Sequence, residues 1–426
     1  MRRTFQTHKN RTARMKLVLT ADNLIDGTGA APVKNGALVI DNGRIVRVTT
    51  KAELGRDTGK GIETIEVKGG TLMPGFIEAH AHMHCSAEAD AFKHITTDSD
   101  QVFLMRATKA MRQALLSGVT TIRDLGSKNN IAFPVKKAIQ DGIIPGPRLL
   151  VVGTPITTTG GHCHMFGTEA NTEEEVVAAV RHQIKLGADY IKMMSTGGGF
   201  TPRTNVRRAQ YSSDILKAAV KDAERMGVRV AAHCHGTEGV KNCVKAGIHN
   251  LIHSTWVSAN PDEIYDYDPK TADQMAEKGL WVDPTLAFDF IWQDKGIPVK
   301  QEDKTVLRSD PARRYEILKD MWDRGVKLVT GIDSGMSHVG FGDFAYTPQV
   351  MTEKVGISAM DSIVSSTKTT ADCLGVLDET GTLEVGKAAD AIIVNGDPLK
   401  SIKVLHKVDT VVTRGKVVKR DGKALV

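Results

Sequence analysis

Six side chains suited to metal binding are spread through the middle of this sequence. The first two are His80 and His82, which close an apolar run that begins near Pro74-Gly75. Side chains two residues apart in an extended strand point to the same side. Because imidazole is the usual nitrogen ligand of zinc, this pair could hold one metal ion. A pair with this spacing is weak evidence on its own.

The other four candidates end later apolar runs: Lys192, His233, His253 and Asp333. A lysine in such a place ordinarily extends to solvent or pairs with a carboxylate. If it is buried and neutral, its amine can react with CO2 to give an anionic carbamate that bridges two metal ions. Asp333 could bind metal, or it could cap the next segment. The ordered set of all six residues, rather than any one of them, indicates a metal site.

Eight apolar runs must position these side chains. They span 72–82, 118–124, 149–153, 190–194, 228–233, 251–253, 280–284 and 327–333. Amphipathic segments typical of helices lie between them, among them 102–116, 173–186, 213–226 and 313–324. Such alternation predicts an α/β fold with a parallel sheet, and eight units predict a (β/α)8, TIM-like barrel with its site at the C-terminal strand ends. A doubly wound sheet is the alternative, but no G-x-G-x-x-G follows the first strand.

Both ends of the chain are rich in short strands and tight turns. Asp41-Asn42-Gly43 is a strong hairpin signal, and Arg414-Gly415 and Asp421-Gly422 are turn signals near the other end. We predict a small β-sandwich built from residues 15–70 and 386–426, and a barrel of residues 71–385. Residues 1–14 are basic and lack an apolar core, so they are predicted to be a disordered tail or an upstream extension rather than a secretory signal.

Composition restricts the function further. The chain has 426 residues, 41% of them apolar and 25% charged, as in soluble globular enzymes. Much of the net charge of +6 lies in the first sixteen residues, so no nucleic-acid partner is predicted. Five irregularly spaced cysteines favour a cytoplasmic setting over disulfides, and no apolar run reaches the roughly 18 residues of a membrane span. A small-molecule substrate is expected, and a homo-oligomer only by analogy with other barrels.

The sequence resembles the amidohydrolase superfamily from about residue 16 onward. The resemblance is carried by Pro74-Gly75, the six candidate ligands and the C-terminal phrase 381–390. The phrases 158–162 and 194–199 are similar to a narrower branch, which contains Xaa-Pro and Xaa-Arg dipeptidases, zinc carboxypeptidases, ochratoxinase-type amidases and urea or thiocarbamate hydrolases. Ile252 and Ile332 stand where that branch commonly has Glu and Thr. These departures bear on the substrate and leave every ligand in place.

The resemblance implies two divalent ions, expected to be zinc, bridged by a carboxylated Lys192 and a hydroxide. His80, His82 and Asp333 would hold one ion, and the other would be held by His233 and His253. The expected reaction is hydrolysis of an amide-type C–N bond in an N-acyl amino acid, a dipeptide or a related amide. Asp333 would take the proton of the hydroxide and deliver it to the leaving nitrogen.

Several further residues are predicted to contact the substrate. His162 lies in a Gly-rich loop, and Tyr211 could donate its phenol proton to a developing oxyanion, or could simply pack. One of three arginines could grip a substrate carboxylate, although a solvated face explains them equally: Arg203, Arg207 and Arg208. His164 and His235 are weaker candidates, the latter as a supporting hydrogen-bond donor. An apolar pocket could be lined by Trp256, Phe288, Phe290 and Trp292.

Three other functions remain open at this stage. A hydrolase of aryl ureas or carbamates fits the same ligands. A single-metal deaminase would use His235 as a ligand and Glu238, three residues later, as its acid–base group. A scaffold that has lost catalysis is disfavoured because every ligand position is filled. Lys192 argues against the deaminase, since a single ion needs no bridging carbamate.

Overall fold

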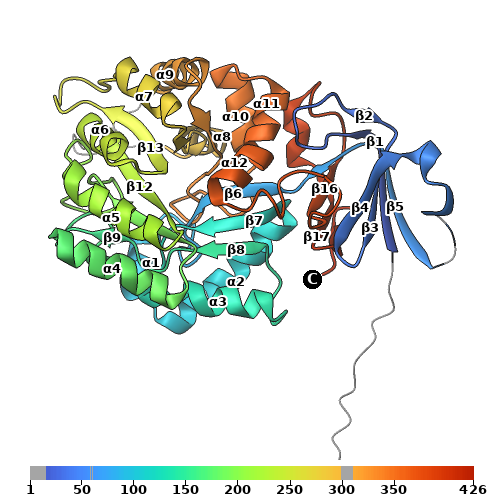
Figure 1. The fold of residues 1–426 in the computed structure, drawn as a ribbon, viewed down its shortest axis with the longest axis horizontal. Coiled ribbons are helices and arrows are strands. Elements are labelled where there is room, and N and C mark those ends of the chain that lie inside the picture. Colours follow the sequence, from blue (N-terminus) through green and yellow to red (C-terminus); the bar gives the residue numbers. More distant parts are fainter. Residues whose placement is uncertain (1–15, 58, 60, 299–309) are drawn as a thin grey trace, which may run out of the picture.

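The two ends of the chain meet in one sheet. The computed structural model describes residues 16–57, 59, 61–298 and 310–426, so the prediction for residues 1–14 lies outside the described part. The nine-stranded sheet has the order β19-β18-β17-β16-β5-β1-β3-β4, with β2 paired to β1. Its strands are β1 (Lys16–Leu24), β2 (Val33–Lys34), β3 (Gly36–Asp41), β4 (Arg44–Thr50), β5 (Ile62–Pro74), β16 (Ala391–Val394), β17 (Val408–Thr413), β18 (Lys416–Arg420) and β19 (Lys423–Ala424). Figure 1 shows these early and late strands side by side at one edge of the molecule.

This sheet confirms the prediction that the two ends pair, whereas the predicted sandwich of two layers is not shown by the strand pairing. Strand pairing runs continuously through a single sheet, because β5 pairs with β1 on one side and with β16 on the other. The hairpin signals are confirmed. Asn42 and Gly43 have φ of 50° and 78°, as a type I′ turn requires, and Arg414 and Gly415 have φ of 48° and 75°.

The middle of the chain forms two parallel sheets. One contains β6 (Phe76–Ala81), β7 (Val119–Asp124) and β8 (Arg148–Val151). The other has the order β10-β9-β11-β12-β13-β14-β15. Its strands are β9 (Ile156–Thr157), β10 (Thr168–Glu169), β11 (Tyr190–Met194), β12 (Arg229–Gly236), β13 (Asn250–Val257), β14 (Trp281–Asp283) and β15 (Lys327–Leu328). Each of the eight predicted apolar runs therefore contributes a strand.

Backbone hydrogen bonds cross both gaps between the parallel sheets. On one side, Asp189 N donates to Val151 O over 2.8 Å. On the other, His82 N donates to Ser334 O over 2.8 Å and Ser334 N to His80 O over 3.2 Å. The strand β15 ends at Leu328, earlier than the predicted 327–333, and the residues after it continue alongside β6. The C-terminal ends of the strands in both parallel sheets therefore lie on the same side of the molecule.

Helices alternate with the parallel strands, as predicted. They are α1 (Ala91–Thr97), α2 (Asp100–Leu116), α3 (Ala132–Gln140), α4 (Glu173–Leu186), α5 (Ser213–Arg225), α6 (Thr237–Ala246), α7 (Pro269–Glu277), α8 (Phe288–Asp294), α9 (Pro311–Asp323), α10 (Tyr346–Val350), α11 (Ala359–Val364) and α12 (Thr370–Leu374). Local signals set their ends. In α4, Thr172 and Glu175 form a capping box, and Gly187 ends the helix in the left-handed conformation.

Buried apolar clusters pack against the parallel strands and against the nine-stranded sheet. One cluster joins Phe76 and Val119 of the parallel part to Ile392 and Val411 of that sheet, so the two parts share a core. All five cysteines are buried and none forms a disulfide. Within the described ranges, no helix has the length and apolarity that crossing a membrane would need.

Candidate metal centre

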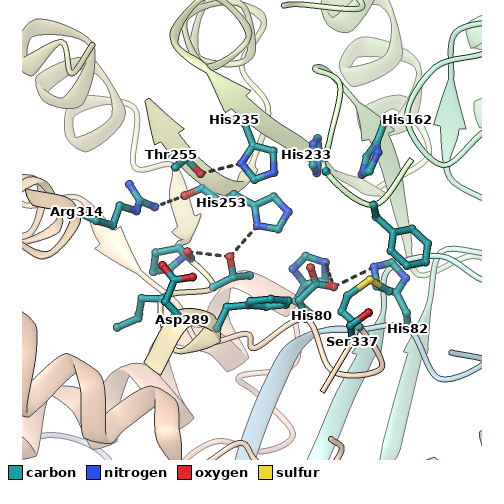
Figure 2. Close-up of a pocket in the computed structure, with 18 of the residues that line it drawn as sticks. His80, His82, His162, His233, His235, His253, Thr255, Asp289, Arg314 and Ser337 are labelled. Atoms are coloured by element: carbon teal, nitrogen blue, oxygen red, sulfur yellow. Dashed lines mark hydrogen bonds and ion pairs between the residues drawn. The ribbon is translucent and has the colours of Figure 1, made fainter. Parts of the chain in front are cut away.

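A cavity of about 360 Å³ opens at the C-terminal ends of the parallel strands. All six predicted ligands line it: His80, His82, Lys192, His233, His253 and Asp333. Figure 2 shows the imidazoles of this set converging from different strands, with His235 and His162 beside them. The predicted rule that polar residues at strand ends gather in one place is therefore seen in the structure.

One group of ligand atoms forms around Asp333. Its Oδ1 lies 3.3 Å from Nε2 of His80 and 3.4 Å from Nε2 of His82, and this buried oxygen has no hydrogen-bond partner. Ligand atoms of His80, His253 and Asp333 all lie within 4.8 Å of one another. Convergent nitrogens around an unsatisfied carboxylate oxygen are what a divalent cation would complete.

A second group contains three imidazoles rather than the two predicted. Ligand atoms of His233, His235 and His253 lie within 4.8 Å of one another. The rings of His235 and His253 stack with centroids 4.5 Å apart, and those of His233 and His253 are 4.8 Å apart. Because His253 belongs to both groups, it lies between the two places where an ion could bind. The HxH spacing of residues 233 and 235, which repeats that of 80 and 82, is the sequence signal for His235.

In three of these rings a hydrogen-bond partner holds one nitrogen, which leaves the other nitrogen for metal. His82 Nδ1 lies 3.0 Å from Gly126 O, and His233 Nε2 lies 3.0 Å from Gly197 O. His253 Nδ1 lies 2.7 Å from Thr285 Oγ1, whose own proton is donated to Pro284 O. Each ring therefore donates outward and keeps the unprotonated nitrogen toward the cavity. Burial lowers the pKa of His82 to about 4, so its ring is neutral and able to bind metal.

Two ligand residues have unusual backbone conformations. His253 and Asp333 have φ of 66° and 61°, in the left-handed region that costs free energy for residues other than glycine. Arg314 on α9 holds the first of these, because its guanidinium donates to the carbonyls of His253 and Ser254. Such strain, fixed by a buried arginine, is typical of functional sites.

Lys192 points into the same cavity from the middle of β11. It is 2% exposed, and burial lowers the pKa of its amine to about 8, while nearby Asp333 opposes that shift. A neutral amine is the form that reacts with CO2. Burial likewise raises the pKa of Asp333 to about 7, against the effect of Lys192. The lysine and the carboxylate therefore lie in the same cavity, and burial shifts both toward their neutral forms, which suits a bridging ligand and a proton carrier.

Two buried carboxylates beneath the ligands were not identified from the sequence. Asp283, at the end of β14, has Oδ2 3.3 Å from Nδ1 of His80. Glu78 accepts hydrogen bonds from the backbone of His80 and Ile332, each over 3.0 Å, and so ties β6 to the last strand. The only signal available was a charged residue within an apolar run.

The two predicted substrate contacts are placed differently. His162 lines the cavity, with its ring 4.4 Å from that of His233. Tyr211 is not among the lining residues, and its hydroxyl donates to Ala170 O over 2.6 Å. Its side chain packs in the core beside α4 and α5, so the packing interpretation describes it better than the oxyanion contact. His164 is exposed and also lies outside the cavity.

The arginines predicted to grip a carboxylate do not reach this cavity. Arg207 donates to the backbone carbonyls of Ser258, Asn260 and Glu263, and so supports a loop. Arg203 and Arg208 line a separate pocket. The arginine found in the cavity is Arg314, which sequence reasoning did not select.

Part of the predicted apolar lining is present. Phe288 and Trp292 of α8 line the cavity, and Phe166, Phe200 and Leu286 join them. Two predicted aromatics pack elsewhere. Trp256 is fully buried in the core, and Phe290 packs against Tyr346. The cavity therefore has a polar, metal-binding floor and a largely apolar wall.

The family model described as "Amidohydrolase family" matches residues 71–418. The chain belongs to this family. It is 28% identical to the ochratoxinase of Aspergillus niger over 420 residues, covering 92% of this chain and 83% of that protein. Among solved structures, a Xaa-Pro dipeptidase with bound methionine in its active site has a TM-score of 0.83 at 29% identity, covering 95% and 100% of the two chains. The A. niger ochratoxinase structure has a TM-score of 0.81 at 26% identity, covering 96% of each.

Proposed function

We propose that this protein is a metal-dependent hydrolase of amide-type C–N bonds, acting on N-acyl amino acids, dipeptides or related amides. The observation that carries the proposal is the convergence of His80, His82, His233, His235 and His253 with Lys192 and Asp333 on one cavity, where their ligand atoms form two groups close enough to hold metal ions. Likeness to a Xaa-Pro dipeptidase and to an ochratoxinase supports an amide as the substrate.

The donor set fits two divalent ions. In the proposed arrangement His80, His82 and Asp333 would hold one, and His233 and His253 would hold the other, with His235 close enough to join them. Lys192, carboxylated on its amine, would bridge them. Zinc suits this set of nitrogen and oxygen ligands. Bound divalent ions would supply a water molecule of lowered pKa and would polarise a carbonyl group.

The chain's own groups would handle the proton and the substrate. Asp333, whose Oδ1 has no hydrogen-bond partner and whose carboxyl pKa is raised by burial, would accept the proton of the attacking water and pass it to the leaving nitrogen. His162, on the cavity wall, would contact the substrate near the carbonyl. Phe166 and Phe288 would exclude bulk water, which strengthens each polar contact inside.

The cavity offers one arginine among its described lining residues, Arg314, whose guanidinium donates to the backbone carbonyl of His253 (Figure 2). A cationic group in the lining suits an amide that also bears a carboxylate. Asp289 lines the same part of the cavity, so a substrate with both charges is accommodated as well.

A second candidate is hydrolysis of neutral aryl ureas or carbamates. The aromatic wall of Phe166, Phe200, Phe288 and Trp292 favours it, since a ring could stack there without any carboxylate. A deaminase is less well supported. His235 does join the metal-binding group, but Glu238 is exposed on α6 and does not line the cavity.

The proposal extends to the fold, the location and the partners of the enzyme. The two parallel sheets, with hydrogen bonds across both seams, would act as one (β/α)8 barrel made of residues 71–385. A small-molecule substrate, a cytoplasmic location, no nucleic-acid or membrane partner and a homo-oligomeric state remain expectations from the sequence.

A substrate panel tests the proposal. Zinc-loaded protein would be incubated with N-acyl amino acids, Xaa-Pro and Xaa-Arg dipeptides, aryl ureas and carbamates, and products identified by mass spectrometry. We expect cleavage of carboxylate-bearing amides, abolished in the Asp333→Asn variant. Cleavage of neutral ureas or carbamates alone would favour the second candidate, and release of ammonia from an aminated ring would favour a deaminase.

A further inference from the structure

A second pocket lies outside the metal cavity, between the loop after β9 and the loop that follows β11. Its volume is about 200 Å³, it is open to solvent, and it shares no lining residue with the metal cavity. The lining is polar and consists of Thr158, Thr159, Gly160, Gly161, Gly197, Arg203, Thr204, Asn205, Arg208, Ala209 and Gln210. Nothing in the proposed reaction uses it.

The charge of this pocket is positive. Arg203 and Arg208 are exposed, no carboxylate lines the pocket, and neither arginine forms an ion pair with any residue in the described ranges. The nearest acid in the hydrogen-bond network is Glu169, whose Oε1 accepts from Gly160 N over 2.8 Å. Arg207, between the two in sequence, turns away to bind the carbonyls of residues 258–263.

The floor of the pocket depends on close backbone approach. A Cβ atom at Gly197 would lie 2.4 Å from Asn205 O, and one at Gly161 would lie 2.5 Å from Thr158 Oγ1. Glycine at both positions lets each loop fold back on itself this tightly, and at Gly161 it also leaves room for Gln210 of the other loop, whose Nε2 would lie 2.9 Å from a Cβ atom there. Arg203, which lines the pocket, has φ of 68°, in the left-handed region that is uncommon for residues other than glycine.

We propose that this pocket binds a small oxyanion of the phosphate class, either free phosphate or a small phosphate monoester. Two guanidinium groups with no carboxylate partner match a phosphate dianion in charge, and each can donate two parallel hydrogen bonds to it. Hydroxyls of Thr158 and Thr159 stand at the same opening.

The pocket is connected to the metal centre through two hydrogen bonds. Gly197, on its floor, accepts from Nε2 of His233 over 3.0 Å. Gln210, on its wall, accepts from the backbone N–H of His162 over 2.7 Å. An anion that draws the two loops together would act on both residues, and by linkage the metal centre would act equally on anion binding.

Calorimetric titration with inorganic phosphate tests the proposal. The full-length protein is titrated both after chelator treatment and after zinc loading. Chloride keeps the ionic strength constant. The test variant is Arg203→Gln/Arg208→Gln. The control is Lys217→Gln/Lys221→Gln, which removes the same charge from exposed positions on α5. We expect saturable binding in the chelator-treated wild type and control, and a dissociation constant raised at least about tenfold in the arginine variant.

Equal binding by the arginine variant and the wild type would overturn the proposal. So would binding that requires zinc and ignores the arginines, because it would place the anion on the metal ions. A parallel titration with glycerol phosphate distinguishes a phosphate monoester from free phosphate as the ligand. Tighter binding of the ester identifies an organic phosphate as the ligand, and equal or weaker binding identifies free phosphate. Near-ultraviolet circular dichroism of the arginine variant confirms that its fold is retained.

Discussion

Asp283 occupies a supporting position beneath the metal ligands. Its Oδ2 lies 3.3 Å from Nδ1 of His80, while its Oδ1 accepts from Thr285 N over 3.1 Å. Thr285 in turn holds the ring of His253. The end of β14 therefore orients one imidazole from each of the two groups, and removing its charge should disturb the binding of both ions.

We expect Asp283→Asn to weaken zinc binding about 10- to 100-fold while leaving the fold intact, because partners behind a ligating histidine set its orientation and basicity. Competition with a chromophoric chelator measures the affinity. The exposed Asp262→Asn substitution is the matched control. An unchanged zinc affinity in Asp283→Asn would show that this carboxylate does not position His80.

Lys192 is the residue on which the two-ion arrangement depends. We expect Lys192→Ala to lose bound metal and turnover together, since no other side chain can bridge from the middle of β11. Metal analysis by mass spectrometry and activity measured on the same sample provide the test. In the wild type, zinc reconstitution should also depend on bicarbonate.

The control for this prediction is Lys217→Ala, on the exposed face of α5. It should bind metal and turn over as the wild type does. A Lys192→Ala variant that keeps two ions and full turnover would contradict the carbamate role.

For Tyr211 we expect a change in stability and not in activity. Its hydroxyl satisfies the buried Ala170 carbonyl and does not reach the cavity. We expect Tyr211→Phe to keep kcat/KM within about twofold of the wild type and to lower the free energy of unfolding by about 1 kcal/mol, measured by urea denaturation. A loss of kcat with unchanged stability would restore the oxyanion role.

For individual residues, the sequence predicted the metal ligands well but did not predict the side chains that support them. His80, Lys192 and Asp333 could be selected because each is a polar residue within an apolar run or at its end, although Lys192 lies in the middle of β11 and not at its end as predicted. Thr285 and Asp283 could not, since only the pairing of β13 with β14 brings them behind ligands far away in the sequence. Tyr211 was misplaced because the direction of a side chain in a loop leaves no periodic signal.

Among the structural elements, the loop after β11 connects the most functional features. Gly197 O receives the outward nitrogen of His233, and Gly198 lies directly against the ring of His162. A Cβ atom at Gly198 would lie 2.3–2.7 Å from three ring atoms of His162. The loop therefore fixes how far this ring extends into the cavity.

We expect Gly198→Ala to displace His162 and lower kcat/KM about tenfold or more, with zinc content unchanged, because small displacements of a positioned group are costly in catalysis. Gly199→Ala is the matched control, since a Cβ atom there has nothing within 4 Å. Steady-state kinetics and metal analysis decide the question. Equal kinetics for the two variants would mean that His162 does not act on the substrate.

Strand and helix periodicity predicted these elements more reliably than their pairing. Glycine and asparagine at the hairpins fixed the turns, because only such residues adopt positive φ cheaply. The length of β15 was overestimated, since the residues after Leu328 turn along β6 and bind it through irregular hydrogen bonds. Apolar character alone does not distinguish such a segment from a regular strand.

The whole molecule depends on a core shared by its two parts. Val411 of β17 and Phe76 of β6 belong to one apolar cluster, although they lie near opposite ends of the chain. The nine-stranded sheet should therefore unfold together with the parallel sheets. The short strands and turn signals at both ends could predict that the ends pair, but the order of the strands depended on contacts far apart in sequence.

Val411→Ala tests this coupling. We expect it to lower the free energy of unfolding by about 2 kcal/mol, through lost burial and a residual cavity, while unfolding stays a single transition. Differential scanning calorimetry of chelator-treated protein measures both. Two separate transitions, with only one shifted, would show that the parts are independent.

The most direct test of the two-ion hydrolase is a zinc titration of chelator-treated protein in bicarbonate, with hydrolysis of the best carboxylate-bearing amide as the readout. We expect activity to rise with added zinc and to reach its plateau at two equivalents per chain, and no activity without metal. Full activity in the metal-free protein, or a plateau at one equivalent, would contradict the account.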